Sequence, residues 1–199
     1  SAINNNASTY VGWAWKAGNT WQSNLDGSIP STVNANTANG FSIVKYTGTG
    51  SATTVGHGLG AAPEMIIVKN ISNSHSSNAH WAVYHTGVGH TKVIYLNRSN
   101  AEGTSSAFWN DTAPTSSVFS IGTDNDVNVD GEDFIAYCWD SVSGFSSIGT
   151  YTGNGSTTGP TVTTGFQPDF LLVKDATNAS TNWRIVDSVR GTDATDGSA

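Results

Sequence analysis

The chain has 199 residues and a formal net charge of −7, with 12% of its residues charged and Lys plus Arg totalling 8. So few basic residues exclude a nucleic-acid backbone as partner, because phosphate binding needs clustered Lys and Arg. The single cysteine, Cys138, excludes an intrachain disulfide and a cysteine-based zinc site, and no apolar run is long enough for membrane insertion.

Gly, Ser, Thr and Asn dominate the composition, which predicts an all-β protein. Thr, Val, Ile and aromatic residues suit a pleated strand, and the Gly, Asn, Asp and Ser between them form turns. Disorder is the rival explanation for so polar a chain, but 7 Trp, 7 Phe and 6 Tyr can supply a hydrophobic core. We therefore expect a folded, strand-rich chain.

The chain opens with a predicted strand and a long connector. Residues 10–15, YVGWAW, have no polar face and predict a strand that is covered on both sides. Residues 16–40 are rich in Asn, Gly, Ser and Thr, and they predict a connector with one short strand at residues 29–33.

Short strands then follow at close intervals. They are predicted at residues 41–46, 53–58, 65–68, 81–85, 92–96, 108–109, 118–121 and 134–139. About eight strands at roughly ten-residue spacing, with turn residues between them and no amphipathic helical window, predict an antiparallel β-sandwich of the jelly-roll kind.

The sequence contains an internal repeat. Residues 46–70, YTGTGSATTVGHGLGAAPEMIIVKN, recur without a gap at residues 151–175, YTGNGSTTGPTVTTGFQPDFLLVKD, with 10 of 25 positions identical and a constant offset of 105. The repeat continues downstream, where WAVYH (81–85) is matched by WRIVD (183–187). Residues 10–15 also resemble FIAYCW (134–139), the last predicted strand of the first copy. Such self-similarity indicates a β unit reused as a building block.

The repeat predicts tandem β modules. On this interpretation residues 1–39 supply the end strand of a preceding module and a connector, and residues 40–140 form a complete sandwich module. Residues 141–199 then begin a second, truncated copy. We expect the chain to be a window cut from a longer modular protein.

The acidic loop at residues 124–133, DNDVNVDGED, is the sharpest chemical feature. Alternating oxygen-bearing side chains followed by Gly131 resemble the first half of a calcium loop, in which oxygens converge on a hard cation. Tyr137 replaces the bidentate Glu expected at the end of such a loop, and Asx residues before Gly also form ordinary turns. Both interpretations stay open here, and the candidate calcium ligands are Asp124, Asp126, Asn128 and Asp130.

Aromatic side chains beside loops form a second candidate site. Trp21 and Trp109 border predicted loops, where an exposed indole is a platform for a sugar ring, although core packing is the alternative. Trp81 and Trp183 recur at matching places in the repeat, which favours a structural role for both.

No catalytic residues are predicted. The five histidines form no His-x-His pair, and the repeat replaces His57 with Val162. A G-x-S-x-G elbow is absent from the sequence. The enzymatic alternative is a polysaccharide depolymerase, whose two carboxylates only the fold could bring together.

Several sequence blocks, in one order, resemble a known family. The blocks are YVGWAWKAG (10–18), LDGSIPSTVNANT (25–37), GFSIVKYTGTG (40–50), VGHGLGAAPEMIIVK (55–69), WAVYH (81–85), WNDTAPTSSVFSIG (109–122) and FIAYCW (134–139). They are similar to an uncharacterised repeat domain of tail-fibre and other virion structural proteins of marine bacteriophages, including cyanophages. In that family the domain often follows a concanavalin-like, laminin-G-type lectin domain and occurs in tandem.

The resemblance implies a non-enzymatic structural module of a tail fibre or other virion appendage, without a cofactor. The implied partners are further copies of the chain in a homotrimer, other virion proteins and a host-surface glycan, and the implied location is the virion. The alternative is a carbohydrate-binding, lectin-like module, with Trp21 or Trp109 as platform and calcium held in the acidic loop.

Overall fold

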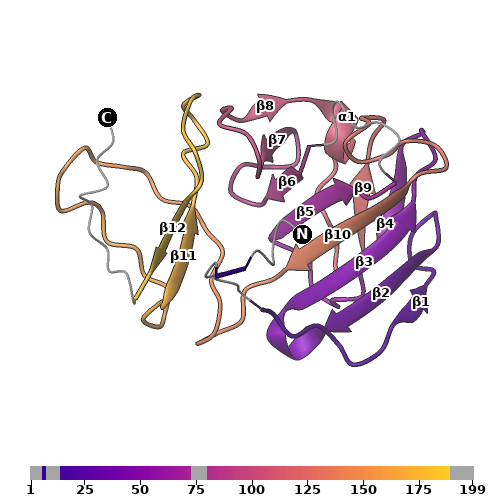
Figure 1. Ribbon diagram of the computed structural model, residues 1–199, viewed down its shortest axis with the longest axis horizontal. Helices are drawn as coiled ribbons and strands as arrows, with labels where there is room; N and C mark the ends of the chain where they lie inside the picture. Colours follow the sequence, from indigo (N-terminus) through magenta and orange to yellow (C-terminus); the bar gives the residue numbers. More distant parts are fainter. Residues whose placement is uncertain (1–5, 8–13, 73–79, 189–199) are drawn as a thin grey trace.

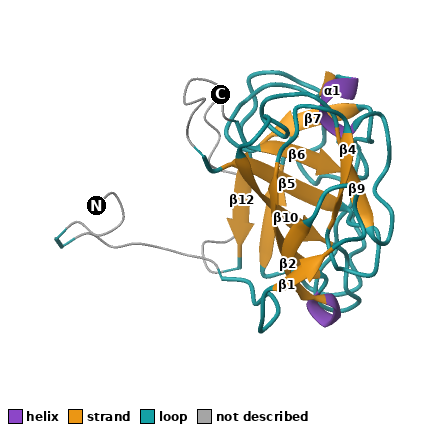
Figure 2. Ribbon diagram, turned by 90° about the vertical axis from the view of Figure 1, so that its right-hand side faces the viewer, coloured by secondary structure: helices purple, strands orange, loops and turns teal. Residues whose placement is uncertain are grey.

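The computed structural model describes residues 6–7, 14–72 and 80–188, and it is built almost entirely of β-strands. Figure 2 shows the strands stacked in layers, with long loops at their ends. The strands are β1 (Gln22–Asn24), β2 (Ser31–Asn36), β3 (Phe41–Thr47), β4 (Thr53–Gly56), β5 (Met65–Asn70), β6 (Ala82–His85), β7 (Lys92–Tyr95), β8 (Gly103–Thr104), β9 (Val118–Ile121), β10 (Asp133–Trp139), β11 (Phe170–Val173) and β12 (Arg184–Asp187). A 3-10 turn, η1 (Thr37–Asn39), and a one-turn helix, α1 (Ser106–Trp109), complete the fold.

The main sheet contains eight strands in the order β1-β2-β3-β10-β5-β6-β7-β8 (Figure 1). All of its pairings are antiparallel. The central strand β10 pairs along its whole length with β3 on one side and with β5 on the other. An antiparallel pair alternates side chains between two faces, so each face of this sheet carries its own set of residues.

The inner face of the main sheet packs against a second layer to form the main core. That layer is the β4–β9 pair, and α1 covers one end of the core. Val44 and Tyr46 from β3 meet Phe119 and Ile121 from β9 there, and all four are buried. The prediction of an all-β antiparallel sandwich is confirmed, in an asymmetric form with one large and one small sheet.

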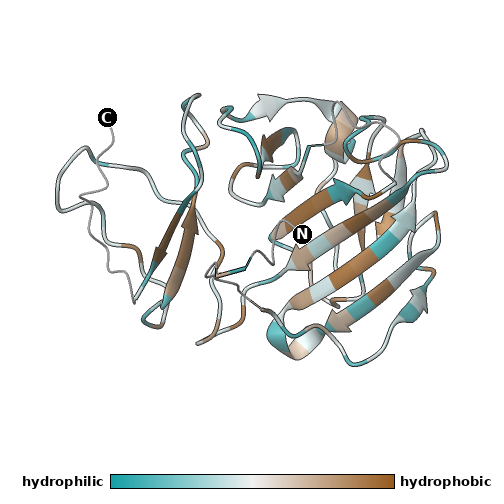
Figure 3. Ribbon diagram, viewed as in Figure 1, coloured by the Kyte–Doolittle hydropathy of each residue, from teal (hydrophilic) through white to brown (hydrophobic). Residues whose placement is uncertain are grey.

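The outer face of the main sheet is also apolar. Ile67, Val83 and Ile94 are buried on this face, and Tyr137 and Trp139 are packed against them. Figure 3 shows apolar residues along β5 and β10. Trp183, from the second copy of the repeat, packs on the same cluster. The sheet is therefore covered on both faces over its centre.

Two predicted strands differ in the structure. Residues 108–109 belong to α1 instead of a strand, because the side chain of Ser105 accepts the backbone N–H of Ala107 and Asn110 ends the turn at a φ of 51°. In the predicted strand 10–15, residues 10–13 lie outside the described residues, and Ala14 and Trp15 have no strand conformation. The short strands β1 and β8 were not expected.

The second copy of the repeat forms a hairpin with the pairing of the first. In the first copy Met65 pairs with His85 and Ile67 with Val83. In the second copy Phe170 pairs with Asp187 and Leu172 with Ile185. The sequence offsets are 105 on the first strand and 102 on the second, so the β11–β12 register is that of β5–β6. Figure 1 shows this hairpin beside the main sheet.

Candidate functional site

The acidic loop forms one wall of a shallow depression of about 440 Å³, which is lined by His80, Arg98, Ala107, Thr123, Asp124, Asn125 and Asp126. The carboxylate of Asp126 accepts the backbone N–H of His80 at 2.7 Å, and the carboxylate of Asp124 accepts the N–H of Asp126 at 2.9 Å. Burial raises the pKa of Asp126, and the negative charge of Asp124 adds to that shift.

The four candidate calcium ligands do not converge on one point. Asn128 is buried and uses its whole amide inside the protein. Its Oδ1 accepts the backbone N–H groups of Thr49 and Gly50 at 2.7 and 3.3 Å. Its Nδ2 donates to the carbonyls of Ser51 and Gly122 at 2.7 and 2.6 Å.

Asn128 is therefore a brace between the acidic loop and the glycine-rich turn of the repeat, and the prediction that it points to a cation is wrong. Asp130 is exposed at the far end of the loop. Across residues 14–72 and 80–188, no group of three or more His, Cys, Asp and Glu side chains is placed to hold a metal ion. Asp124 and Asp126 remain together at the depression.

The two candidate tryptophans have opposite environments. Trp109 is 1% exposed, and its indole N–H donates to the carbonyl of Lys92 at 3.0 Å. It packs edge-on against Tyr84, so it is a core residue and the prediction of a ligand platform is wrong there. Trp21 is 52% exposed and keeps an open ring surface. It does not line the depression beside the acidic loop.

His57 is the one described histidine in the core. Its Nδ1 accepts the N–H of Leu59 at 3.1 Å, so its Nε2 carries the hydrogen and donates to the carbonyl of Thr115 at 3.1 Å. Burial lowers the pKa of His57, against a smaller opposing effect of that hydrogen bond. The ring is a neutral cross-link between loops. His75 lies outside the described residues.

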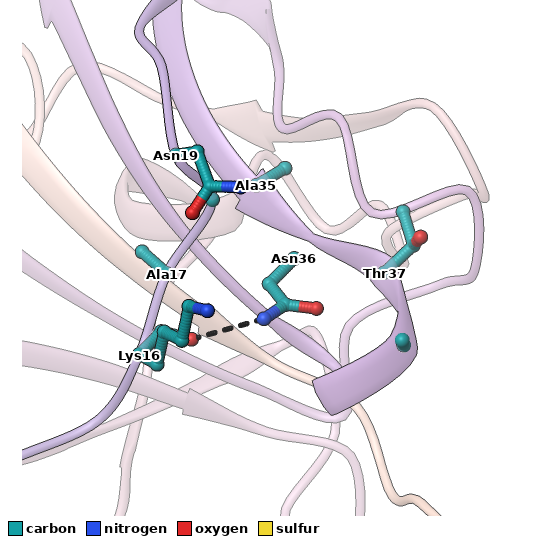
Figure 4. Close-up of a pocket in the computed structure, with 8 residues that line it drawn as sticks. Lys16, Ala17, Asn19, Ala35, Asn36 and Thr37 are labelled. Atoms are coloured by element: carbon teal, nitrogen blue, oxygen red, sulfur yellow. Dashed lines mark hydrogen bonds between the residues drawn. The ribbon is translucent and has the colours of Figure 1, made fainter.

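The depression in Figure 4 lies between residues 16–19 and the end of β2. It measures about 250 Å³ and is lined by Lys16, Ala17, Gly18, Asn19, Ala35, Asn36, Thr37 and Ala38. The side-chain amide of Asn36 donates to the carbonyl of Lys16 at 3.3 Å across it. A Cβ at Gly18 would lie 2.4 Å from the carbonyl oxygen of Ala35, so only glycine allows this close approach. Apart from Lys16, the lining consists of small apolar and uncharged polar residues.

The most extensive arrangement is the junction between the two copies of the repeat, formed by residues 95–102 of the first and residues 176–183 of the second. The indole N–H of Trp183 donates to the carbonyl of Tyr95 at 2.7 Å. Two backbone hydrogen bonds accompany it, from Glu102 to Ala176 at 2.7 Å and from Thr181 to Ser99 at 3.2 Å. These contacts run in both directions across the junction.

The second-copy side of the junction is held in shape by charged groups. The ammonium of Lys174 donates to both the carbonyl and the hydroxyl of Thr181, at 2.6 and 2.9 Å. The carboxylate of Asp175 accepts the side-chain N–H of Asn178 at 2.8 Å and the backbone N–H groups of Asn178 and Thr177, and these bonds lower the pKa of Asp175. The junction loop is thus ordered by its own hydrogen bonds.

The sequence predicted a structural role for Trp183 from its recurrence at Trp81 but did not predict its partner. Nothing in the sequence marks Tyr95 or Ser99, because the groups that take part are their backbone carbonyls. Chemically, the junction can hold two β units at a fixed spacing. The depression beside the acidic loop is lined by the carboxylates of Asp124 and Asp126 and by Arg98.

Residues 1–198 match the family model described as Domain of unknown function (DUF7483). No curated protein and no solved structure matches the chain. In the described residues no helix is long and apolar enough to cross a membrane. Because the family model covers nearly the whole sequence, the chain belongs to the family of that domain of unknown function, DUF7483.

Proposed function

We propose that the chain is a non-enzymatic structural module of a virion appendage, such as a bacteriophage tail fibre. In this role it spaces and stiffens the appendage outside the host cell. Further copies of the chain, in a homotrimer, and other virion proteins are its partners. No cofactor takes part in this function.

The observation that supports the proposal is the junction between the two repeat copies. The second hairpin keeps the strand register of the first. The loop before its second strand bonds to the end of β7 and the residues after it, through the indole of Trp183 and the carbonyl of Tyr95 at 2.7 Å and through two backbone bonds. Backbone hydrogen bonds depend on the conformation of the main chain and not on which side chains are present. The same contacts can therefore recur from one repeat unit to the next although the sequences diverge. A series of such units makes a rod. The phage-like sequence blocks of residues 10–139 favour an appendage as its location.

Two measurements test this function. Light scattering during size-exclusion chromatography should give three times the 20.7 kDa mass of the chain, and a single-chain mass at all concentrations contradicts the homotrimer. Gold-labelled antibodies against the chain should decorate a tail or fibre on particles from the source culture. Intact particles that carry no label contradict a virion location.

A lectin-like function is the second candidate, and the depression beside the acidic loop favours it. Asp124, Asp126 and the exposed Arg98 supply the hydrogen-bonding groups that a polar sugar needs. A glycan array run with and without a chelator tests this candidate. A signal lost in Arg98→Ala but kept in Trp21→Ala would place the sugar in the depression. A signal lost only with chelator would make calcium part of the site, and no signal in either condition rejects the lectin.

A further inference from the structure

We propose that the fold presents Asn154 as a site of spontaneous deamidation, a reaction that converts its side-chain amide into a carboxylate without an enzyme or a cofactor. The site lies in the turn of the second repeat copy, residues 151–156, YTGNGS. Asn154 is followed by Gly155, and both residues are exposed. Each event makes the formal net charge of −7 more negative by one. The assignment does not depend on the appendage function.

The reaction is a ring closure within the main chain. The backbone nitrogen of Gly155 loses its proton and attacks Cγ of Asn154. A C–N bond forms, the bond from Cγ to Nδ2 breaks, and ammonia leaves with the proton. Water then opens the five-membered imide at either of its two carbonyls, which gives aspartate or isoaspartate. The sum is one water consumed and one ammonia released, so no oxidant or reductant is needed.

The hydrogen bond that the Asn154 amide receives is the first observation. The backbone N–H of Ser156 donates to Oδ1 of Asn154 at 2.9 Å. Negative charge develops on Oδ1 when the nitrogen attacks Cγ, and a donor that is already in place stabilises that charge. The same bond holds the side chain against the peptide that follows it, beside the attacking nitrogen.

The open surroundings of Gly155 are the second observation. Gly155 has a φ of 68°, and a Cβ built on it would meet nothing within 4 Å. Without a side chain, it leaves its nitrogen unshielded. Within the part of the chain that the structure describes, no hydrogen bond uses the N–H of Gly155. The nitrogen can therefore turn toward Cγ without breaking a bond or displacing a neighbour.

The first copy has the same turn without the reactive group. Gly50 has a φ of 66°, and the side-chain oxygen of Thr49 accepts the N–H of Ser51 at 3.4 Å. Thr49 carries no amide that could leave. The amide oxygen of Asn128 also accepts the N–H groups of Thr49 and Gly50. The turn geometry thus recurs, and the second copy combines it with an asparagine before an open glycine.

The other Asn-Gly pair of the sequence, Asn39–Gly40, is held closed. The N–H of Gly40 donates to the carbonyl of Thr37 at 3.4 Å, and the carbonyl of Gly40 accepts the N–H of Asp140 at 2.9 Å. Gly40 is buried, and a Cβ on it would lie 2.4 Å from the carbonyl oxygen of Asp140. This pair can react only in the fraction of molecules in which its segment has opened.

Peptide mapping of the unmodified chain tests the proposal. During incubation at about pH 8, the peptide with Asn154 should gain about 1 Da and separate into an aspartate and an isoaspartate form. Asn39 should react at least about tenfold more slowly, because its segment must open first. Equal rates at the two sites in the folded chain overturn the proposal. So does an unchanged Asn154, or aspartate as its only product, since isoaspartate is the mark of the ring.

Two controls separate the effect of the fold from that of the sequence. In guanidinium chloride the unfolded chain should modify Asn39 and Asn154 at similar rates, because both precede glycine. A difference that persists there comes from the flanking residues and overturns the role of the fold. Asn154→Thr, which introduces the first copy's residue, should abolish the reaction at this position. It should leave the denaturation midpoint unchanged, because the side chain is exposed.

Discussion

The phenol of Tyr46 donates a 2.7 Å hydrogen bond to the backbone carbonyl of Val127, 81 residues later in the chain. The ring of Tyr46 stacks on Phe134 with centroids 5.3 Å apart, and burial raises its pKa well above the usual value. Its counterpart in the second copy, Tyr151, is 53% exposed. One motif residue therefore ties the acidic loop to the core in the first copy and faces solvent in the second.

Replacing Tyr46 by Phe should reduce the free energy of unfolding by about 1–3 kcal/mol, because the buried carbonyl of Val127 loses its donor. Tyr151→Phe removes the same hydroxyl from the same motif at an exposed position, and it should change stability by less than about 0.5 kcal/mol. Urea denaturation followed by Trp fluorescence measures both. Equal losses in the two variants contradict a specific role for the Tyr46 bond.

The glycine two residues later in the motif gives a second matched pair. A Cβ at Gly48 would lie 2.3 Å from the carbonyl oxygen of Val129, whereas a Cβ at Gly153 meets nothing within 4 Å. Gly48→Ala should therefore cost about 1–3 kcal/mol of stability through overpacking. Gly153→Ala should be neutral or slightly stabilising, since it only restricts the unfolded chain. Thermal denaturation of the two variants checks this, and a stable Gly48→Ala protein would show that the turn can shift.

Patterns that depend on local sequence predicted much of the fold. Alternation in residues 41–46 and the short apolar runs at residues 65–68 and 134–139, each bounded by turn residues, predicted strands, and the structure has strands there. The strand prediction for residues 108–109 was wrong. Two adjacent aromatic residues favour a strand, but the N-cap at Ser105 stabilises one helical turn there instead. Local sequence patterns could not predict the strand order, because β10 pairs with β3 and β5 although it lies far from both in the sequence.

The candidate sites depended on burial, which composition does not reveal. Trp21 and Trp109 both stand beside turn residues in the sequence, and only the fold puts one of them at 52% and the other at 1% exposure. Asn128 sits in a calcium-like spacing, but its amide bonds to backbone groups of the glycine-rich turn at residues 49–51 and to the carbonyl of Gly122. Comparison of the two repeat copies was a better guide to the structure than composition. Residues matched by the repeat occupy matching register positions in β5–β6 and β11–β12.

The hydrogen bonds of the buried Asn128 amide predict a large loss of stability when this residue is replaced by an isosteric one. Asn128→Asp replaces the amide that donates to the carbonyls of Ser51 and Gly122 with a carboxylate oxygen, which repels them. We expect a loss of about 2–4 kcal/mol, because the second carboxylate oxygen places a buried negative charge against two carbonyls that have lost their donor, and the N–H groups of Thr49 and Gly50 offset only part of that cost. Asn125→Asp, at an exposed position of the same loop, is the control and should have little effect. If calcium instead restores Asn128→Asp to full stability, the loop can hold the cation after all.

His57 predicts a pH dependence of stability. Burial lowers the pKa of His57 below 6.5, the value of an unperturbed ring, so near and below that pH the unfolded chain binds more protons than the folded one. The contribution of His57 to the free energy of unfolding is therefore fully present above about pH 7 and is lost as the pH decreases through about 6. Burial also lowers the pKa of His85, which adds in the same direction.

His57→Gln isolates this contribution. The variant is less stable at neutral pH but should lose less stability on acidification, with one proton fewer taken up on unfolding. Urea denaturation at several pH values between about 5 and about 8 gives the slope. Parallel curves for the variant and the unmodified chain would show that His57 does not titrate in this range.

The junction makes a prediction about local rather than global stability. Trp183→Phe keeps an aromatic ring on the outer face of the main sheet but removes the indole N–H that donates to the carbonyl of Tyr95. One hydrogen bond contributes about 0.5–1.5 kcal/mol, so the second hairpin should open several-fold more often. The main core contains no residue of β11 or β12, and its melting temperature should stay the same. Proteolysis within residues 141–188 should therefore become faster, while residues 40–140 resist proteolysis as before.

Trp21→Phe, at an exposed ring, is the control and should leave both the melting temperature and the proteolysis rate unchanged. A lower melting temperature of residues 40–140 would mean that the two copies unfold as one cooperative unit. An unchanged proteolysis rate would mean that the backbone hydrogen bonds from Glu102 and Thr181 hold the junction without the indole.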